Sequence, residues 1–302
     1  MAKVMQVLIK RQCIILFTLF LFVPGILLAH NPRIVKENIT EINNPEVSQA
    51  FYGELRGKEA EFIINSEVEF RLYAGVLVPD IKNVNTDIMA EIYRFKDEKK
   101  ETLAFLDGSR HEWKPYYEEY AQDNYLWGPE YRADNSSDEK DIKGRLVPAG
   151  NYRVKVYSPS NLGKYVLVVG FLEAWSPKDI IKALIDVPPL KLKFFEEPVL
   201  KVLLSTFGLA YIIFLYLLAG ITDLAYRFIL QRLSQNSNRR LKKNIGTTDR
   251  LFRAAIGIGL LIWAVMTSWS PILIFLSGFV IFESIFSWCG LYAALGKNTC
   301  PL

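Results

Sequence analysis

Aromatic and acidic side chains gather in the segment from Trp113 to Tyr131. Aromatic rings stack on sugar rings or fill pockets of a protein partner, and carboxylates hydrogen-bond hydroxyl groups. The large aromatic residues of this segment are Trp113, Tyr116, Tyr117, Tyr120, Tyr125, Trp127 and Tyr131. We expect a long loop whose rings pack onto its own domain. The alternative is that the rings bind a glycan or an extracytoplasmic protein.

Acid–base chemistry has little support in this segment. Glu118 and Glu119 are adjacent, and neighbours on a strand point to opposite faces, so they are not expected to share a site. His111 has no Ser-x-Gly elbow or H-x-x-H spacing beside it and is expected at the surface. An acidic aromatic segment also cannot serve nucleic acid, whose phosphates need cations. We therefore predict a protein that is not an enzyme and has neither cofactor nor metal.

Two cysteines near the C-terminus, Cys289 and Cys300, are candidates for thiol redox chemistry or metal exchange. Two sulfurs fall short of the four ligands of a closed zinc site, although a dimer supplies four. The alternative is that both are small packing residues at a membrane surface. Glu283 lies inside an apolar run, where charge is costly, and is a functional candidate by default. Its alternative is snorkelling or protonation.

The elements that must position these residues follow from the apolar runs. Lys10 and Arg11 precede a short apolar stretch that ends at Pro24-Gly25, and the small residue Ala29 follows. This pattern predicts a secretory signal cleaved after Ala29, with an uncleaved anchor as the alternative. Either form exports the residues that follow.

A second run, from Val202 to Ile221, holds 20 residues without a charge, which is long enough to cross a bilayer. Residues 31–197 have a net charge of −6 and residues 198–302 a net charge of +7. The basic stretch after the second run is expected in the cytoplasm and the acidic block outside. Two further runs, 254–269 and 271–288, are predicted to form a helical hairpin that returns the C-terminus to the cytoplasm. Ala255 and Gly259 would allow close helix approach there, and Trp269 suits the membrane interface.

The exported block alternates polar and apolar residues with a period of two. Examples are Phe70 and Leu72 around Arg71, and the stretch from Tyr152 to Val156. The continuous β-branched run from Tyr165 to Val169 predicts a central strand. We expect an all-β sandwich or jelly roll of antiparallel strands, followed by three transmembrane α-helices.

Between the block and the membrane, Ser176 and Pro177 predict the start of a short helix that Val187-Pro188-Pro189 ends. Lys191 to Pro198 is expected to approach the membrane interface. The predicted organisation is signal peptide 1–29, extracytoplasmic β-sandwich 30–175, juxtamembrane helix and linker 176–198, transmembrane helix 199–222, basic cytoplasmic linker 223–248 and two-helix membrane domain 249–302.

The last domain resembles a known family. It opens on Asn244-Ile245-Gly246-Thr247-Thr248-Asp249-Arg250-Leu251-Phe252-Arg253 and closes on Cys289-Gly290-Leu291-Tyr292 and Gly296-Lys297-Asn298-Thr299-Cys300-Pro301. These motifs resemble the YgaP-like inner-membrane domain, a two-helix module also fused to rhodanese domains. The resemblance implies a membrane module able to form a homodimer, and no rhodanese activity, since nothing upstream resembles a rhodanese loop.

The same opening has a direct physical interpretation. Thr247 or Thr248 is expected to cap the helix, with Asp249 in its first turn near the positive end of the dipole. Arg250 and Arg253 are expected to face lipid headgroups.

Part of the exported block also resembles a family. Val147-Pro148-Ala149-Gly150-Asn151-Tyr152 and Gly163-Lys164-Tyr165-Val166-Leu167 look like the end of a bacterial pre-peptidase-type β-sandwich. The resemblance implies a binding or accessory fold. The alternatives of a thiol-dependent membrane redox or sulfur-handling protein, and of a carbohydrate-binding module, stay open.

Overall fold

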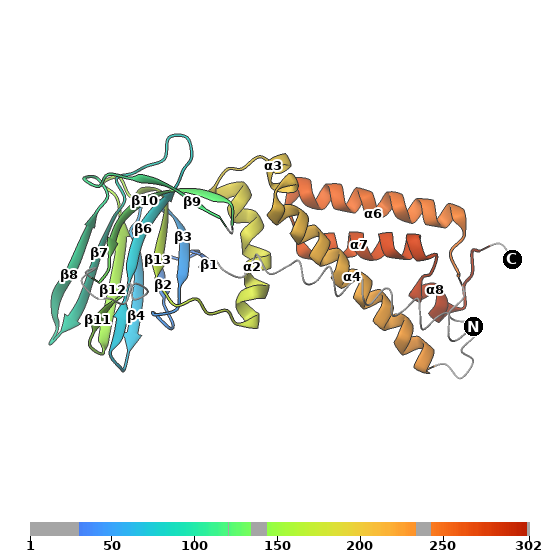
Figure 1. Ribbon diagram of the computed structural model, residues 1–302, viewed down its shortest axis with the longest axis horizontal. Coiled ribbons are helices and arrows are strands. Elements are labelled where there is room, and N and C mark those ends of the chain that lie inside the picture. Colours follow the sequence, from blue (N-terminus) through green and yellow to red (C-terminus); the bar gives the residue numbers. More distant parts are fainter. Residues whose placement is uncertain (1–29, 120, 134–143, 234–242, 301–302) are drawn as a thin grey trace. The chain divides into compact units, whose positions relative to one another are not determined.

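A computed structural model describes residues 30–119, 121–133, 144–233 and 243–300. The predicted signal peptide and Tyr120 lie outside the described residues. The chain divides into a β-rich unit within residues 26–197 and a helical unit that contains residues 198–302 (Figure 1). The large β-rich region followed by apolar helices confirms the coarse prediction. The jelly-roll form and three membrane crossings stay predictions.

The β-rich unit contains two main sheets. The first has the strand order β1 (Asn31–Ile34), β3 (Gln49–Arg56), β13 (Leu162–Val169), β6 (Ala74–Pro79), β10 (Asp123–Tyr131) and β9 (Lys114–Glu118). The second has the order β2 (Ile39–Glu41), β4 (Ala60–Ser66), β12 (Gly150–Tyr157), β7 (Met89–Lys96) and β8 (Lys99–Asp107). β5 (Phe70–Leu72) and β11 (Arg145–Val147) form a separate pair.

The strand pairing agrees with the sequence pattern in the centre and differs at the edges. β13 lies inside the first sheet, as its β-branched run predicts, and pairs antiparallel with β3 and β6. β1 pairs with β3, and β2 with β4, in parallel. The expectation of purely antiparallel strands is therefore wrong at these two edges. Each edge strand is followed by a connection long enough to return in the same direction.

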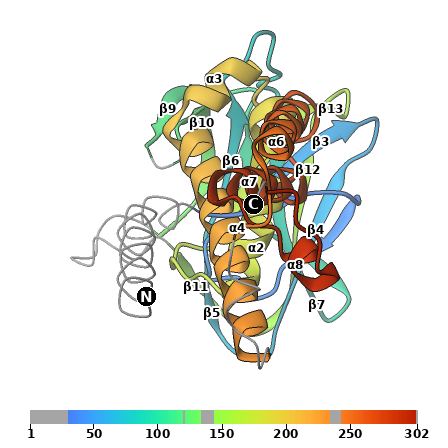
Figure 2. The ribbon, with the colours of Figure 1, turned by 90° about the vertical axis from the view of Figure 1, so that its right-hand side faces the viewer.

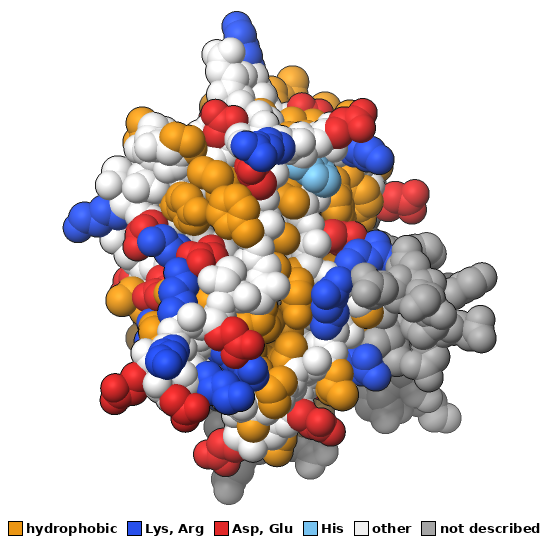
Figure 3. Space-filling view, turned by 90° about the vertical axis from the view of Figure 1, so that its left-hand side faces the viewer, with side chains coloured by type: hydrophobic (Ala, Val, Ile, Leu, Met, Phe, Trp, Pro, Cys, Tyr) orange, Lys and Arg blue, Asp and Glu red, His pale blue; other side chains and the backbone are white. Residues whose placement is uncertain are grey.

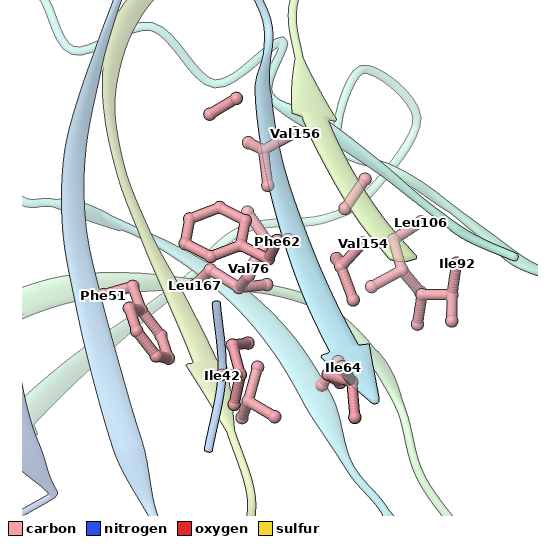
Figure 4. Close-up of a cluster of buried hydrophobic side chains, with 14 of the residues drawn as sticks. Ile42, Phe51, Phe62, Ile64, Val76, Ile92, Leu106, Val154, Val156 and Leu167 are labelled. Carbon is pink, nitrogen blue, oxygen red and sulfur yellow. The ribbon is translucent and has the colours of Figure 1, made fainter. Parts of the chain in front are cut away.

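The core lies between the two main sheets. Phe62, Val154 and Leu167 come from strands of both sheets, and each is fully buried. Figure 4 shows these side chains pointing toward one another from several strands, with Phe51 and Ile92 around them. Alternate residues of each strand supply this layer, which is the arrangement that period-two sequences produce.

After the sheets, the chain is helical. The elements are α2 (Pro177–Pro189), the π-helix η2 (Leu190–Phe194), α3 (Val199–Leu204), α4 (Thr206–Leu233), α6 (Thr247–Thr267), α7 (Pro271–Phe286) and α8 (Gly290–Leu295). The Ser176 side chain caps α2 by accepting the Asp179 N–H, as predicted. The helix does not stop at Val187: it runs to Pro189 and continues as η2.

Within the described part of the helical unit, two helices are long and apolar enough to cross a membrane: residues 206–229 of α4, and α6. The apolar helix α7 is shorter, with 16 residues. The first span begins later than Val202 because the helix breaks at Ser205, whose hydroxyl accepts the Gly208 N–H at 3.0 Å. α4 also continues through residue 233, so the predicted linker 223–248 begins as helix.

α6 and α7 form the predicted hairpin, and α4 packs along α7 (Figure 2). The close approach of α6 to α7 occurs at Gly257, not at the predicted Ala255 and Gly259. A Cβ built on Gly257 would lie 2.6 Å from Ile281 Cγ1, whereas one on Gly259 meets nothing within 4 Å. Gly257 therefore provides the small surface that the packing needs.

Candidate functional site

The segment from Trp113 to Tyr131 is a strand pair, not the predicted long loop. β9 and β10 are antiparallel, with Tyr116 opposite Tyr125. The Tyr116 ring centre lies 5.0 Å from that of Trp127, in an edge-to-face arrangement. Rings spaced by two residues thus gather on one side of the hairpin. β9 is also an edge strand of its sheet.

The structure separates the predicted aromatic set. Tyr116 and Tyr117 are exposed by 41% and 51%. Trp113 packs against the core, and its indole N–H donates to the Gly108 carbonyl at 2.8 Å. Tyr131 is half-buried, with the Arg145 guanidinium 5.1 Å from its ring centre. Only part of the segment can therefore meet a ligand.

Tyr125 and Trp127 belong instead to a second hydrophobic cluster on the outer face of the first sheet. Tyr125 is buried, and its hydroxyl lies 2.9 Å from that of Tyr52. Phe194 and Phe195 at the end of η2 cover these rings, with centre-to-centre distances of 5.3 Å for Tyr52–Phe194 and 5.1 Å for Tyr125–Phe195. The packing explanation of these two aromatics is therefore the one that the geometry supports.

A buried ion pair holds η2 against the β9–β10 hairpin. Lys191 Nζ lies 2.5 Å from Asp123 Oδ1 and also donates to the Ala121 carbonyl. The Glu118 carboxylate accepts the Ala121 N–H, which closes the turn between β9 and β10. Burial raises the pKa of Asp123 to about 6, and the nearby Lys191 ammonium opposes that rise.

Residues 191–198, which are expected to approach the membrane, also pack against the sheet. Lys191, Phe194 and Phe195 are buried against the sheet. Lys164 adds a second attachment, because its ammonium donates to the Phe194 carbonyl at 2.9 Å and pairs with Glu196 at 2.7 Å. The segment after α2 is thus an integral part of the β-rich unit.

The remaining acid–base candidates do not converge. Glu118 is buried at the end of β9, whereas Glu119 follows in the turn and is exposed. His111 is exposed, with its ring centre 6.1 Å from that of Trp113. On the visible face of the molecule, Lys and Arg side chains are interspersed with Asp and Glu (Figure 3). That face offers no single-sign field for a polyanion.

In the helical unit, the two arginines expected at lipid headgroups bind within the bundle. Arg253 Nη1 lies 2.5 Å from Glu283 Oε2, and Arg253 Nε lies 3.0 Å from Asp249. Arg250 Nε donates to the Ser284 carbonyl at 2.8 Å. Glu283 is therefore a buried ion-pair partner, which explains how its charge is accommodated.

Hydrogen bonds among the family motifs join three chain segments. The Asn244 side-chain carbonyl accepts the Cys289 N–H at 2.8 Å, and its amide donates to the Cys289 carbonyl at 2.9 Å. The Asn244 backbone carbonyl accepts the Thr299 N–H at 3.0 Å. Gly246, not a threonine, is the N-cap of α6, and Asp249 lies in its first turn. These bonds tie the start of α6 to both cysteine-bearing segments.

Both cysteines are free thiols, Cys289 buried and Cys300 half-buried. Burial of Cys289 limits access of an electrophile or a metal. Among the described residues, no group of three or more His, Cys, Asp or Glu could hold a metal ion.

α4 meets this domain through polar and aromatic contacts that the sequence did not reveal. The Tyr216 hydroxyl lies 2.8 Å from that of Ser277, and Tyr211 donates to the Trp269 carbonyl at 3.3 Å. Trp269 is fully buried among these helices. The Arg227 guanidinium lies 4.5 Å from the Trp288 ring centre. Apolar runs in the sequence do not predict such pairs, because the partners lie far apart along the chain.

Comparison with known families assigns the C-terminal part. Residues 241–302 match the model of the family described as "Inner membrane protein YgaP-like, transmembrane domain". With the two apolar helices, this match identifies an inner membrane protein. A comparison with curated protein sequences gives no match.

Solved structures resemble the β-rich unit only weakly. One is the pre-peptidase C-terminal domain of collagenase from Bacillus anthracis, with 9% identity and a TM-score of 0.24, covering 47% of this chain and 95% of that one. Another is AvmM, described as catalysing macrocyclization in alchivemycin A biosynthesis, with 10% identity and a TM-score of 0.18, covering 47% and 64%. TM-scores this low decide nothing about function.

Proposed function

We propose that the protein is a non-enzymatic binding or accessory protein, anchored in the inner membrane, with its β-rich unit outside the cytoplasm. The charge distribution supports the orientation, because loops rich in Lys and Arg are ordinarily retained in the cytoplasm, and the stretch after α4 is basic whereas residues 31–197 are acidic. In this arrangement the helical unit is the anchor and the β-rich unit carries the recognition surface.

The observation that carries the proposal is the docking of η2 on the outer face of the first sheet. Phe194 and Phe195 bury the aromatic cluster there, so the part of this face under η2 is closed to a ligand, whereas Tyr116 beside Trp127 stays exposed. Only Glu196, Glu197 and Pro198 lie between Phe195 and α3. A linker of three residues spans roughly 10–14 Å when extended. The β-rich unit is thus a domain on a short tether.

The recognition surface that we propose is the edge strand β9. Tyr116 and Tyr117 are exposed on opposite faces of this strand, and an edge strand has free backbone N–H and C=O groups. Exposed tyrosines beside such an edge suit an extended peptide segment that adds as a further strand. The favoured ligand is therefore an extracytoplasmic protein.

Photocrosslinking in intact cells tests this surface. A benzophenone amino acid in place of Tyr117 is expected to give a discrete adduct, and one in place of Phe95 is not. Phe95 is a matched control because it is exposed to a similar degree, 47%, but lies on β7, an interior strand of the second sheet. Equal adducts from both positions, or none from Tyr117, would remove β9 from the proposal.

A carbohydrate ligand is a second candidate, supported by an exposed tyrosine ring on each face of β9, since tyrosine faces stack on sugars. Glycan-array binding by the purified full chain tests it. Tyr116→Ala and Tyr117→Ala are expected to abolish such binding, whereas Phe95→Ala is expected to leave it unchanged. Trp127→Ala is unsuitable for this test, because Trp127 packs in the cluster under η2.

A further inference from the structure

The helix α2 presents its apolar side chains outward. Ile181 and Ile185 are exposed by 60% and 53%, whereas Ala183 and Asp186 are buried. A surface helix of a domain ordinarily shows the reverse pattern, with its large apolar residues toward the core. α2 therefore has an apolar face that the β-rich unit does not use.

This face also carries two lysines. Lys178, Ile181, Lys182 and Ile185 follow the spacing i, i+3, i+4, i+7, which places them along one side of a helix. Both lysines are exposed and border the isoleucines on the side toward β1, where they line a hollow with Arg33. The outward side of α2 is therefore a stripe of isoleucines with two cations along one edge.

The orientation of the stripe is fixed by the opposite side of the helix. Asp179 pairs with Arg33 of β1 at 2.5 Å, and the Ser176 hydroxyl donates to the Asp179 carboxylate at 2.6 Å. The capping box holds the first turn, and η2 holds the last. α2 cannot roll to bury its isoleucines without breaking these bonds.

We infer that this stripe lies on the surface of the membrane in which the chain is anchored, with Ile181 and Ile185 in the interface and Lys178 and Lys182 at lipid phosphates. An amphipathic helix with lysines beside its apolar face is the form that binds anionic bilayers. The occupant is a lipid surface and not another protein, because the apolar stretch of α4 begins at Thr206, soon after this helix in the same chain. Every molecule of this protein therefore has a bilayer within reach of α2.

The consequence is a fixed orientation of the β-rich unit at the membrane. A short tether alone limits distance, but a second contact through α2 also limits rotation. The membrane contact of α2 requires a membrane-anchored chain and does not depend on ligand binding by β9. A negative result for either proposal therefore does not affect the other.

Lipid-borne quenching tests the contact in the full chain. Cys13, Cys289 and Cys300 are replaced by alanine, and Ile181→Cys carries an NBD fluorophore, with Ile185→Cys as a second site. Leu146→Cys, an equally exposed apolar position on β11, is the control. Each variant is placed at one copy per nanodisc of phosphatidylcholine and phosphatidylglycerol, with doxyl-labelled lipid as quencher.

The expected result is at least about threefold stronger quenching at positions 181 and 185 than at 146, with blue-shifted emission. Adding Lys178→Glu and Lys182→Glu is expected to reduce that quenching in anionic discs. Quenching at 181 and 185 equal to that at 146 would overturn the inference. One copy per disc excludes cover by a second chain, and unchanged protease fragments show that each labelled variant is folded.

Discussion

Lys191 and Asp123 form an ion pair from which water is almost excluded: Nζ and Oδ1 are 2.5 Å apart, and the two side chains are 5% and 6% exposed. The pair joins residues 68 positions apart in sequence. Because it sits beside the rings that η2 covers, it fixes the segment before the membrane to the sheet.

Removal of the cation is predicted to open this attachment. Lys191→Met leaves Asp123 buried without its counter-charge, which costs about 3–5 kcal/mol. Hydrogen exchange of the full chain in nanodiscs is expected to become faster at the amides of η2 and β10. Lys193→Met is the control, because Lys193 is exposed two residues away. Similar exchange in both variants would show that the pair contributes little.

The pH dependence follows from the same site. The pKa of Asp123 is about 6 in the folded chain, above its ordinary 3.8. The folded state therefore binds this proton more tightly than the unfolded chain does. The Asp123 contribution to the free energy of unfolding is largest below pH 3.8 and falls as the pH rises to 6.

Urea unfolding of the β-rich unit, followed by tryptophan fluorescence of the full chain between pH 4 and 7, measures this contribution. Asp123→Asn is expected to remove that part of the slope, whereas Asp87→Asn, which is exposed, is expected to keep it. An unchanged slope in Asp123→Asn would contradict the assignment.

Two glycines of α6 allow a controlled test of the packing between α6 and α7. Gly257→Val is predicted to destabilise the bundle by about 1–3 kcal/mol, because the added carbons meet Ile281. Gly259→Val is predicted to leave the thermal midpoint in detergent nearly unchanged, because that position is open. If a homodimer forms through the exposed side of α6, Gly259→Val would instead weaken the dimer, which cross-linking detects.

Asn244 is predicted to control the exposure of Cys289. Asn244→Ala removes both hydrogen bonds to the Cys289 backbone, at a cost of about 1–3 kcal/mol. Maleimide labelling of Cys289 is expected to accelerate at least about tenfold relative to Cys300. Asn298→Ala, which affects only the Cys300 N–H, is the control. Fast labelling of Cys289 in the unaltered chain would favour the thiol-redox alternative.

Local sequence patterns predicted the elements that need only apolar surroundings or neighbouring residues, and no particular distant partner. The β-branched run from Tyr165 to Val169 needed only apolar surroundings, and it lies in the interior of its sheet. The serine cap of α2 and the hairpin turn before Pro271 depend on nearby residues alone. Such features are decided within a few positions of the chain.

Tertiary pairing decided the rest. The dense aromatic residues of the segment from Trp113 to Tyr131 suggest a loop. In the structure, the register of β9 with β10 places some of these rings in the core and others at the surface. Lys191 lies in a stretch that the sequence alone assigns to the approach to the membrane, and its ion pair with Asp123 is visible only in the structure. Arg253 is similar, since Glu283 is 30 residues away. Sequence spacing gives no information on such partners.

The central claim is that the β-rich unit and the basic stretch after α4 lie on opposite sides of the inner membrane. Single cysteines at Ser109 and Ser237, in a chain without native cysteines, are labelled in intact spheroplasts with a membrane-impermeant maleimide. We expect Ser109→Cys to be labelled at once and Ser237→Cys only after lysis. Labelling of Ser237→Cys in intact spheroplasts, with Ser109→Cys protected, would contradict it.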